Sequence, residues 1–81
     1  MNALNRDLKY MERVVIKAKH MSPKYQALPQ RVFVVEGGYG MLAEVDNCRI
    51  FGTLEFDGRQ IDIFGDQIDA AETESLQAGE E

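Results

Sequence analysis

Basic side chains recur at helical spacing near the start of the chain. They follow one another at intervals of three, four, four and three residues: Arg6, Lys9, Arg13, Lys17 and His20. At about 100° per residue, this spacing places all five on one side of an α-helix. Cations in such a row can contact successive phosphates of a nucleic acid, and Tyr10 beside them could stack on a base. The pattern therefore predicts a nucleic-acid-binding face, with RNA as the favoured polyanion.

The distribution of charge along the chain supports this hypothesis and also suggests another. Residues 1–31 hold seven basic and two acidic residues, whereas residues 32–81 hold two basic and twelve acidic ones. The two parts carry +5 and −10, which gives the chain its net charge of −5. Such asymmetry is typical of a polyanion-binding arm, but a basic face could also meet the acidic surface of a neighbouring subunit. A protein-facing role therefore stays open.

The residue types that catalyse reactions or hold metals do not form a recognisable set. His20 and Cys48 are the only histidine and cysteine, and the carboxylates follow neither a calcium-loop nor an acid–base pattern. We therefore predict no catalytic residue, no metal and no cofactor. The single cysteine excludes an internal disulfide and favours a reducing compartment. No apolar run is long enough to span a membrane, so we expect a cytoplasmic protein without membrane contact.

A helix over residues 3–20 would have to present the basic face. Apolar residues recur on its opposite side: Leu4, Leu8, Met11, Val15 and Ala18. Ser22-Pro23 would end the helix, because the residue before a proline avoids the α region. The sequence thus predicts an amphipathic N-terminal helix with one apolar and one basic stripe.

From Arg31 onward the pattern changes to strands. Residues 31–36 form a predicted strand that contains the apolar, mainly β-branched run 32–35. The turn signals Asp46-Asn47 and Asp57-Gly58 predict further strands over 41–45, 48–56 and 59–64. Two-residue turns would set Phe51 opposite Phe64. One face then forms a predicted core: Met41, Ala43, Val45, Cys48, Ile50, Leu54, Phe56, Ile61 and Ile63. The other face is polar except for a row of three apolar residues: Leu42, Phe51 and Phe64.

This apolar row predicts an interface. A solvated face does not normally keep two phenylalanines side by side, so we expect the N-terminal helix of the same chain or of a neighbour to cover it. The row and the helix could instead bind a protein. The chain would then be an adaptor or regulatory protein, of the kind that phages and mobile elements encode, without nucleic-acid binding. Because so small a domain buries little surface alone, we also expect a homo-oligomer.

The segment 47–57 resembles the first motif of the Sm-like proteins, which are RNA-binding rings. The matching residues are Gly52, Leu54, Phe56 and Asp57. The expected order, a helix followed by short bent strands, is also similar to that of SH3-like barrels. The resemblance implies a small barrel that assembles into rings. It carries over no ligand-binding residue.

Together these observations predict an α+β fold with an N-terminal helix followed by a strongly bent antiparallel sheet, closed as a small SH3-like or Sm-like barrel. A single domain would span residues 1–71. Residues 72–81 are acidic and nearly devoid of apolar side chains, so we expect a disordered tail. The predicted function is that of a non-enzymatic, self-assembling binding module.

Overall fold

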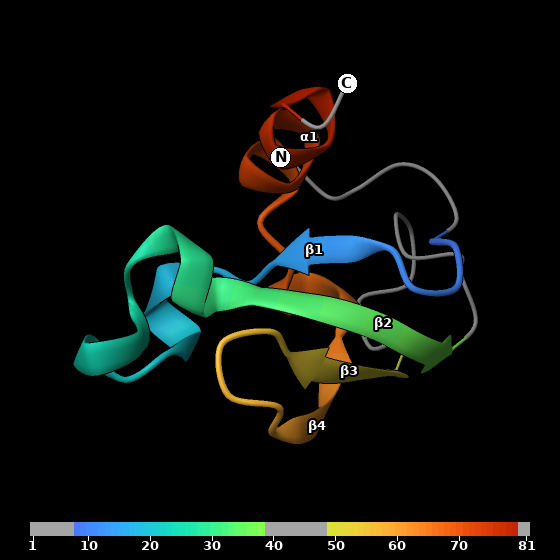
Figure 1. Cartoon of the computed structure of the whole chain (residues 1–81), viewed down its shortest axis with the longest axis horizontal. Helices are drawn as coiled ribbons and strands as arrows, with labels where there is room; N and C mark the ends of the chain where they lie inside the picture. The colour runs from blue at the N-terminus through green and yellow to red at the C-terminus, as the bar shows by residue number, and fades with distance from the viewer. Residues whose placement is uncertain (1–7, 39–48, 80–81) are drawn as a thin grey trace.

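A computed structural model describes residues 8–38 and 49–79 of the chain. Its described part contains an antiparallel sheet in the order β1-β2-β3-β4 and a C-terminal helix, α1 (Figure 1). The strands are β1 (Arg13–Val15), β2 (Val32–Gly38), β3 (Arg49–Leu54) and β4 (Gln60–Phe64). The helices are the 3-10 turns η1 (Ala18–His20), η2 (Pro23–Tyr25), η3 (Leu28–Arg31) and η4 (Gly65–Gln67), and α1 (Ala70–Gly79).

The prediction of an N-terminal helix over residues 3–20 is wrong for the part of it that the structure describes. A turn bonds the Glu12 N–H to the Lys9 carbonyl at 3.1 Å, and Met11 has a φ of 66°. The chain then enters β1, where Val14 lies opposite Phe33 of β2. Residues 1–7 lie outside the described residues.

The run Val14-Val15-Ile16 explains why a strand forms here. β-Branched side chains are restricted in a helix and pack well on a pleated sheet. All three residues are buried, which a helix with one apolar stripe would not allow. Consecutive burial is instead expected of a strand that is covered on both faces.

The α-helix lies at the other end of the chain. The prediction of a disordered tail over residues 72–81 differs from the structure, in which α1 occupies most of that segment. Asp69 Oδ1 accepts the Glu72 N–H at 3.0 Å, so Asp69 caps the first turn. Glu72 itself lies in that turn, where negative charge is favourable.

Helix α1 closes the outer edge of β1, beside which it lies in Figure 1. The Val15 N–H donates to Thr73 Oγ1 at 3.0 Å, and Thr73 is completely buried. The Gln77 side-chain amide donates to the Arg13 carbonyl at 2.8 Å. The Asp69 N–H donates to the Val15 carbonyl, also at 2.8 Å. The outer edge of β1 is therefore bonded by α1 and by the segment that leads into it, where Ile68 forms an isolated antiparallel bridge with Ile16.

The sheet is open, so the predicted barrel is wrong. Closure would require β1 and β4 to pair, but they lie at opposite ends of the strand order. The outer edge of β1 is already occupied by α1 and Asp69. The predicted order of helix before sheet is reversed as well, since the α-helix follows the strands.

The turn between β3 and β4 forms at the predicted Asp57-Gly58, where Gly58 has a φ of +78° that favours glycine. Its loop is longer than predicted, because Leu54 already bonds to Arg59. Arg49, and not Phe51, therefore lies opposite Phe64. The predicted register is wrong by two residues. An even shift keeps the side chains within β3 and β4 on their predicted faces.

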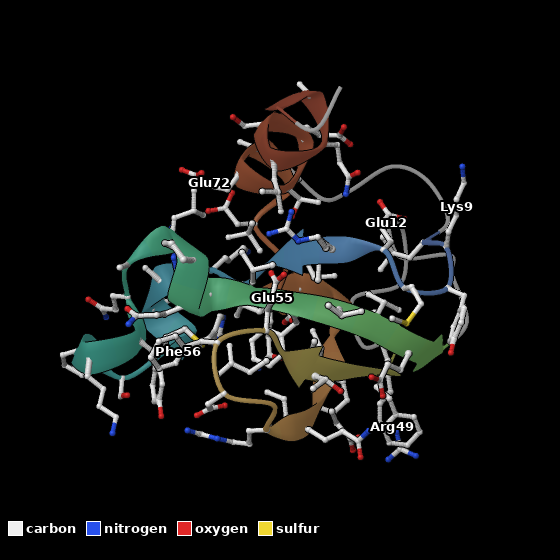
Figure 2. All side chains as sticks on the ribbon, viewed as in Figure 1. Lys9, Glu12, Arg49, Glu55, Phe56 and Glu72 are labelled. Carbon is white, nitrogen blue, oxygen red and sulfur yellow. The ribbon has the colours of Figure 1, made fainter. Side chains whose placement is uncertain are left out.

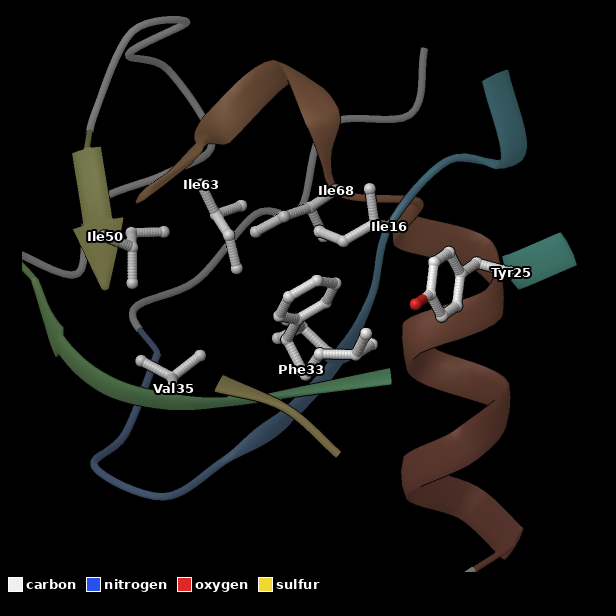
Figure 3. Packing of buried hydrophobic residues seen from close by; sticks show 9 residues of the cluster. Ile16, Tyr25, Phe33, Val35, Ile50, Ile63 and Ile68 are labelled. Carbon is white, nitrogen blue, oxygen red and sulfur yellow. The ribbon is translucent and has the colours of Figure 1, made fainter. Parts of the chain in front are cut away.

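The core lies on one face of the sheet (Figure 3). It consists of Val14, Ile16, Tyr25, Phe33, Val35, Ile50, Leu54, Ile63 and Ile68. The prediction of a core face is confirmed for Ile50, Leu54 and Ile63 but wrong for Phe56 and Ile61, which are exposed. The other predicted members, Met41, Ala43, Val45 and Cys48, lie outside the described residues.

Gly52 of β3 permits the close packing of this core. A Cβ at this position would come within 2.5 Å of Ile63 Cδ1 and 3.4 Å of Phe33 Cβ. The glycine that suggested an Sm-like motif therefore has a packing role in this fold.

Candidate interaction surface

The predicted basic stripe is dispersed, because the helix that would align it is absent from the described residues. Arg6 lies outside them. Lys9 and Tyr10 are exposed in the turn before β1, and the Lys9 N–H donates to Glu12 Oε1 at 2.9 Å. Lys17 follows β1, and His20 ends η1. These residues belong to a turn, a strand end and a 3-10 turn, so they do not form one continuous row.

Among the members of the stripe that the structure describes, only Arg13 lies within a strand, and its side chain is paired. Its Nη2 and Nε atoms lie 2.9 and 3.1 Å from Glu55 Oε1. Arg13 belongs to β1 and Glu55 to the loop after β3, so this ion pair crosses over β2, which lies between them in the sheet. The charge of Arg13 is thus balanced within the chain, which weakens its predicted role in phosphate binding.

Two phenylalanines and an ion pair form a surface patch on the face of the sheet opposite the core. Arg49 lies opposite Phe64, and Phe51 lies opposite Asp62. These four residues lie at the corners of a square on the sheet surface. Arg49 Nη1 and Asp62 Oδ2 are 3.6 Å apart, so the ion pair spans one diagonal of this square. The two rings occupy the other diagonal. We call these four residues the Phe51–Phe64 patch.

The patch is open to solvent. Phe51 is 49% exposed and Phe64 is 37% exposed. We expected the N-terminal helix to cover this row, but α1 contacts β1, at the opposite end of the strand order. In Figure 2, Arg49 lies near β3 and β4, whereas Glu72 of α1 lies beyond β1. Leu42, the third member of the predicted row, lies outside the described residues.

A polar cluster that the sequence did not predict joins η2 to the β3–β4 loop. Arg59 Nη2 donates to the Tyr25 hydroxyl at 2.6 Å, and this hydroxyl donates to Asp57 Oδ2 at 3.2 Å. The guanidinium of Arg59 and the ammonium of Lys24 lie 4.9 and 5.1 Å from the centre of the Tyr25 ring. Phe56 meets the same ring edge-on. These groups hold one another, which indicates a structural role.

A hollow of about 180 Å³ lies next to this cluster. Its lining comes from His20, Met21, Ser22, Tyr25, Phe33, Leu54, Arg59 and Ile61. The hydroxyl of Tyr25 and the guanidinium of Arg59 bond to each other and to Asp57. The space is small and mainly apolar, so it resembles a gap in the packing more than a site with converging polar groups.

The contacts of Asp57 predict a specific acid sensitivity. The Arg59 main-chain N–H donates to Asp57 Oδ1 at 3.0 Å and is the main reason that the pKa of this carboxyl lies below its usual 3.8. Tyr25 and the Arg59 guanidinium add to this lowering of the pKa, and desolvation opposes it. Since the folded state binds this proton less tightly than the unfolded state, the carboxylate stabilises the fold above pH 3.8. That contribution is lost as the pH falls through the folded-state pKa.

We therefore expect Asp57→Asn to lower the melting temperature at pH 7, and its difference from the wild type to become smaller at about pH 2.5. Asparagine keeps an oxygen that can accept the Arg59 N–H, so the comparison isolates the charge. Thermal unfolding followed by circular dichroism at both pH values measures the difference. If the difference in melting temperature between the two proteins were the same at both pH values, the stabilising role of the Asp57 carboxylate would be contradicted.

Within residues 8–38 and 49–79, no group of three or more histidine, cysteine, aspartate or glutamate residues is placed to hold a metal ion. No helix of this part of the chain is long and apolar enough to cross a membrane. Comparisons with protein-family models, curated proteins and solved structures found no match to this chain. The resemblance to Sm-like and SH3-like proteins therefore has no support beyond the short segment that suggested it.

Proposed function

We propose that this chain is a non-enzymatic protein-interaction module that binds a protein partner through the Phe51–Phe64 patch. The observation that carries the proposal is the pair of exposed rings around the Arg49–Asp62 ion pair. Aromatic side chains are enriched in protein interfaces, and arginine often accompanies them. A matching partner presents an apolar surface bordered by charged groups.

Charge favours a protein over a nucleic acid at this patch. Proteins that stack bases on exposed aromatics surround them with a positive groove that follows the phosphates. Here Asp62 lies directly opposite Phe51, and the chain has a net charge of −5. Binding of RNA through Arg6, Lys9, Arg13, Lys17 and His20 stays a prediction, although the helix on which it depended is not found in the described residues.

The test is affinity capture from a lysate of the native host, compared between three forms of the chain. We expect the wild type and Tyr10→Ala to retain the same partner, and Phe51→Ala/Phe64→Ala to lose it by at least about tenfold. Tyr10 is a matched control because it is also an exposed aromatic, but it lies in the turn before β1. Quantitative mass spectrometry of the captured proteins measures the ratio.

The alternative outcomes are distinct. Retention of the partner by the double phenylalanine variant would contradict the proposal. Capture that disappears when the lysate is treated with nuclease would show that a nucleic acid mediates it. Direct binding of a labelled single-stranded RNA, with an affinity that falls steeply with salt and with Lys9→Glu/Lys17→Glu, would favour the polyanion hypothesis instead.

A further inference from the structure

The described residues close one edge of the sheet and leave the other open. At the β1 edge, Thr73 and Gln77 of α1 bond to main-chain groups of the strand. At the other end of the strand order, β4 forms the margin of the sheet (Figure 1). A strand at such a margin can pair with another chain unless something blocks it.

The hydrogen-bond pattern shows which groups of β4 face outward. Leu54 of β3 donates its N–H to the Arg59 carbonyl at 2.7 Å. In an antiparallel ladder, every second residue bonds to the partner strand. Ile61 and Ile63 continue this series and bond toward β3. The intervening residues Gln60, Asp62 and Phe64 therefore direct their main-chain groups away from the sheet.

These outward groups are available for pairing. The Phe64 N–H is occupied, because it donates to Gln67 Oε1 at 3.1 Å. The N–H and C=O groups of Gln60 and Asp62 have no hydrogen bond to any other residue that the structure describes. Residues 60–64 contain no proline, no lysine and no bulge, which are among the features that prevent edge-to-edge pairing.

We propose that the occupant of this edge is a second copy of the chain, with β4 pairing antiparallel to β4 about a twofold axis. The axis passes between the two copies of Ile61. Gln60 then lies opposite Asp62 of the second copy, and Asp62 lies opposite its Gln60. Each of these two pairs exchanges two main-chain hydrogen bonds, as narrow pairs in antiparallel ladders do. The interface is isologous, as a closed dimer requires.

Side-chain chemistry selects this register. An axis through Asp62 would place two carboxylates directly opposite each other, which is destabilising. An axis through Ile63 would require the Phe64 region, where Gln67 occupies the main-chain N–H and the chain turns into η4. In the proposed register, the uncharged side chain of Gln60 lies opposite Asp62 of the second copy, so no like charges meet. Within each copy, Gln60 Nε2 donates to Glu36 Oε1 at 3.0 Å, and Asp62 Oδ2 lies 3.6 Å from Arg49 Nη1.

Burial supports the same arrangement. Ile61 is 38% exposed at the rim of the core, although its neighbour Ile63 is completely buried. Pairing about Ile61 brings the two exposed side chains together on the core face. The result is a continuous eight-stranded sheet in which both Phe51–Phe64 patches lie on the same face. Dimerisation does not depend on the proposed function, because it uses main-chain groups of the β4 edge, whereas partner binding uses the exposed rings of Phe51 and Phe64.

Two charge variants at position 60 test the register. Gln60→Lys places a cation opposite Asp62 of the second copy, whereas Gln60→Glu places an anion there. Because of the twofold symmetry, each substitution changes two such pairs in the dimer. We expect the dissociation constant of the dimer to be at least about tenfold lower for Gln60→Lys than for Gln60→Glu at low salt. The difference should shrink in about 1 M salt. Sedimentation equilibrium over a range of protein concentrations measures both constants.

Asp62→Pro tests the edge itself. Proline removes an N–H that faces outward and is tolerated on an edge strand in that orientation, so we expect a folded monomer. Phe51→Ala/Phe64→Ala should remain dimeric, which separates this inference from the proposed partner binding. A wild-type chain that is monomeric at about 1 mM would overturn the proposal. So would equal dissociation constants for the two position-60 variants, or a dimer that survives Asp62→Pro.

Discussion

Replacing Phe33 with alanine is expected to lower the free energy of unfolding by about 3–5 kcal/mol. Phe33 is only 1% exposed and lies in the middle of the core cluster (Figure 3). Its removal forfeits the burial of the ring and leaves a cavity that the surrounding β-branched side chains cannot fill. The hollow of about 180 Å³ that Phe33 already lines would become larger. Urea denaturation followed by circular dichroism measures the loss.

The chain offers a matched control for this prediction. Phe51 lies on the neighbouring strand β3 but on the opposite face, where half of its surface is exposed. We expect Phe51→Ala to cost less than about 1 kcal/mol, since substitutions of exposed side chains have small effects. Equal losses from the two alanine variants would mean that the two faces of the sheet are not assigned correctly.

Replacing Thr73 with valine is expected to lower the free energy of unfolding by about 2 kcal/mol. The two side chains are similar in size, so the main change is the loss of the hydroxyl. Thr73 Oγ1 accepts the Val15 N–H at 3.0 Å in a completely buried position. Valine would leave that N–H without an acceptor and away from water, which costs the desolvation of the group.

Thr73→Ser is the matched control, because it keeps the accepting oxygen and removes only a methyl group. We expect a loss of about 1 kcal/mol for serine, smaller than that for valine. Native-state hydrogen exchange adds a local measurement, in which the amide of Val15 should lose protection in Thr73→Val but keep it in Thr73→Ser. If valine proved as stable as threonine, α1 would not cap the edge of β1 through this bond.

The β3–β4 hairpin was the most predictable part of the fold. Asp57-Gly58 carries its own turn chemistry, since Gly58 adopts a positive φ and Asp57 accepts the Arg59 N–H. Alternation of apolar and polar residues then assigned Ile50, Leu54 and Ile63 to the core face. The loop length was not predictable, because it depends on the Leu54–Arg59 pairing and on the contact between Phe56 and Tyr25.

The two ends of the chain were predicted in the wrong order for a physical reason. Apolar residues at helical spacing between Leu4 and Ala18 suggested a helix, but the β-branched run 14–16 decides the local structure once β2 pairs with one edge of β1 and α1 occupies the other. The acidic C-terminus suggested disorder. Asp69, followed three residues later by Glu72, is a signal for the start of a helix. This signal was missed because the C-terminal segment has few apolar residues.

The candidate site was predictable only for the residues that the alternation of polar and apolar side chains along a strand is sufficient to identify. Phe51 and Phe64 were identified because they interrupt a polar face, and both are exposed on that face in the structure. The cluster of Tyr25, Asp57 and Arg59 was missed because Tyr25 lies more than 30 positions from the other two residues and meets them only through the tertiary fold. No local spacing indicates such contacts.

The occupied edge of β1 has a consequence for how far association can proceed. A sheet whose two edge strands are both unpaired can add a further copy of the chain at each edge. Such contacts do not close on themselves, so they produce a filament. Because Asp69, Thr73 and Gln77 bond to outward main-chain groups of β1, a pair joined through β4 leaves neither end of the strand order open among the described residues. The short C-terminal helix thereby prevents the addition of further strands at the β1 edge, and it protects a strand-rich protein from fibre growth.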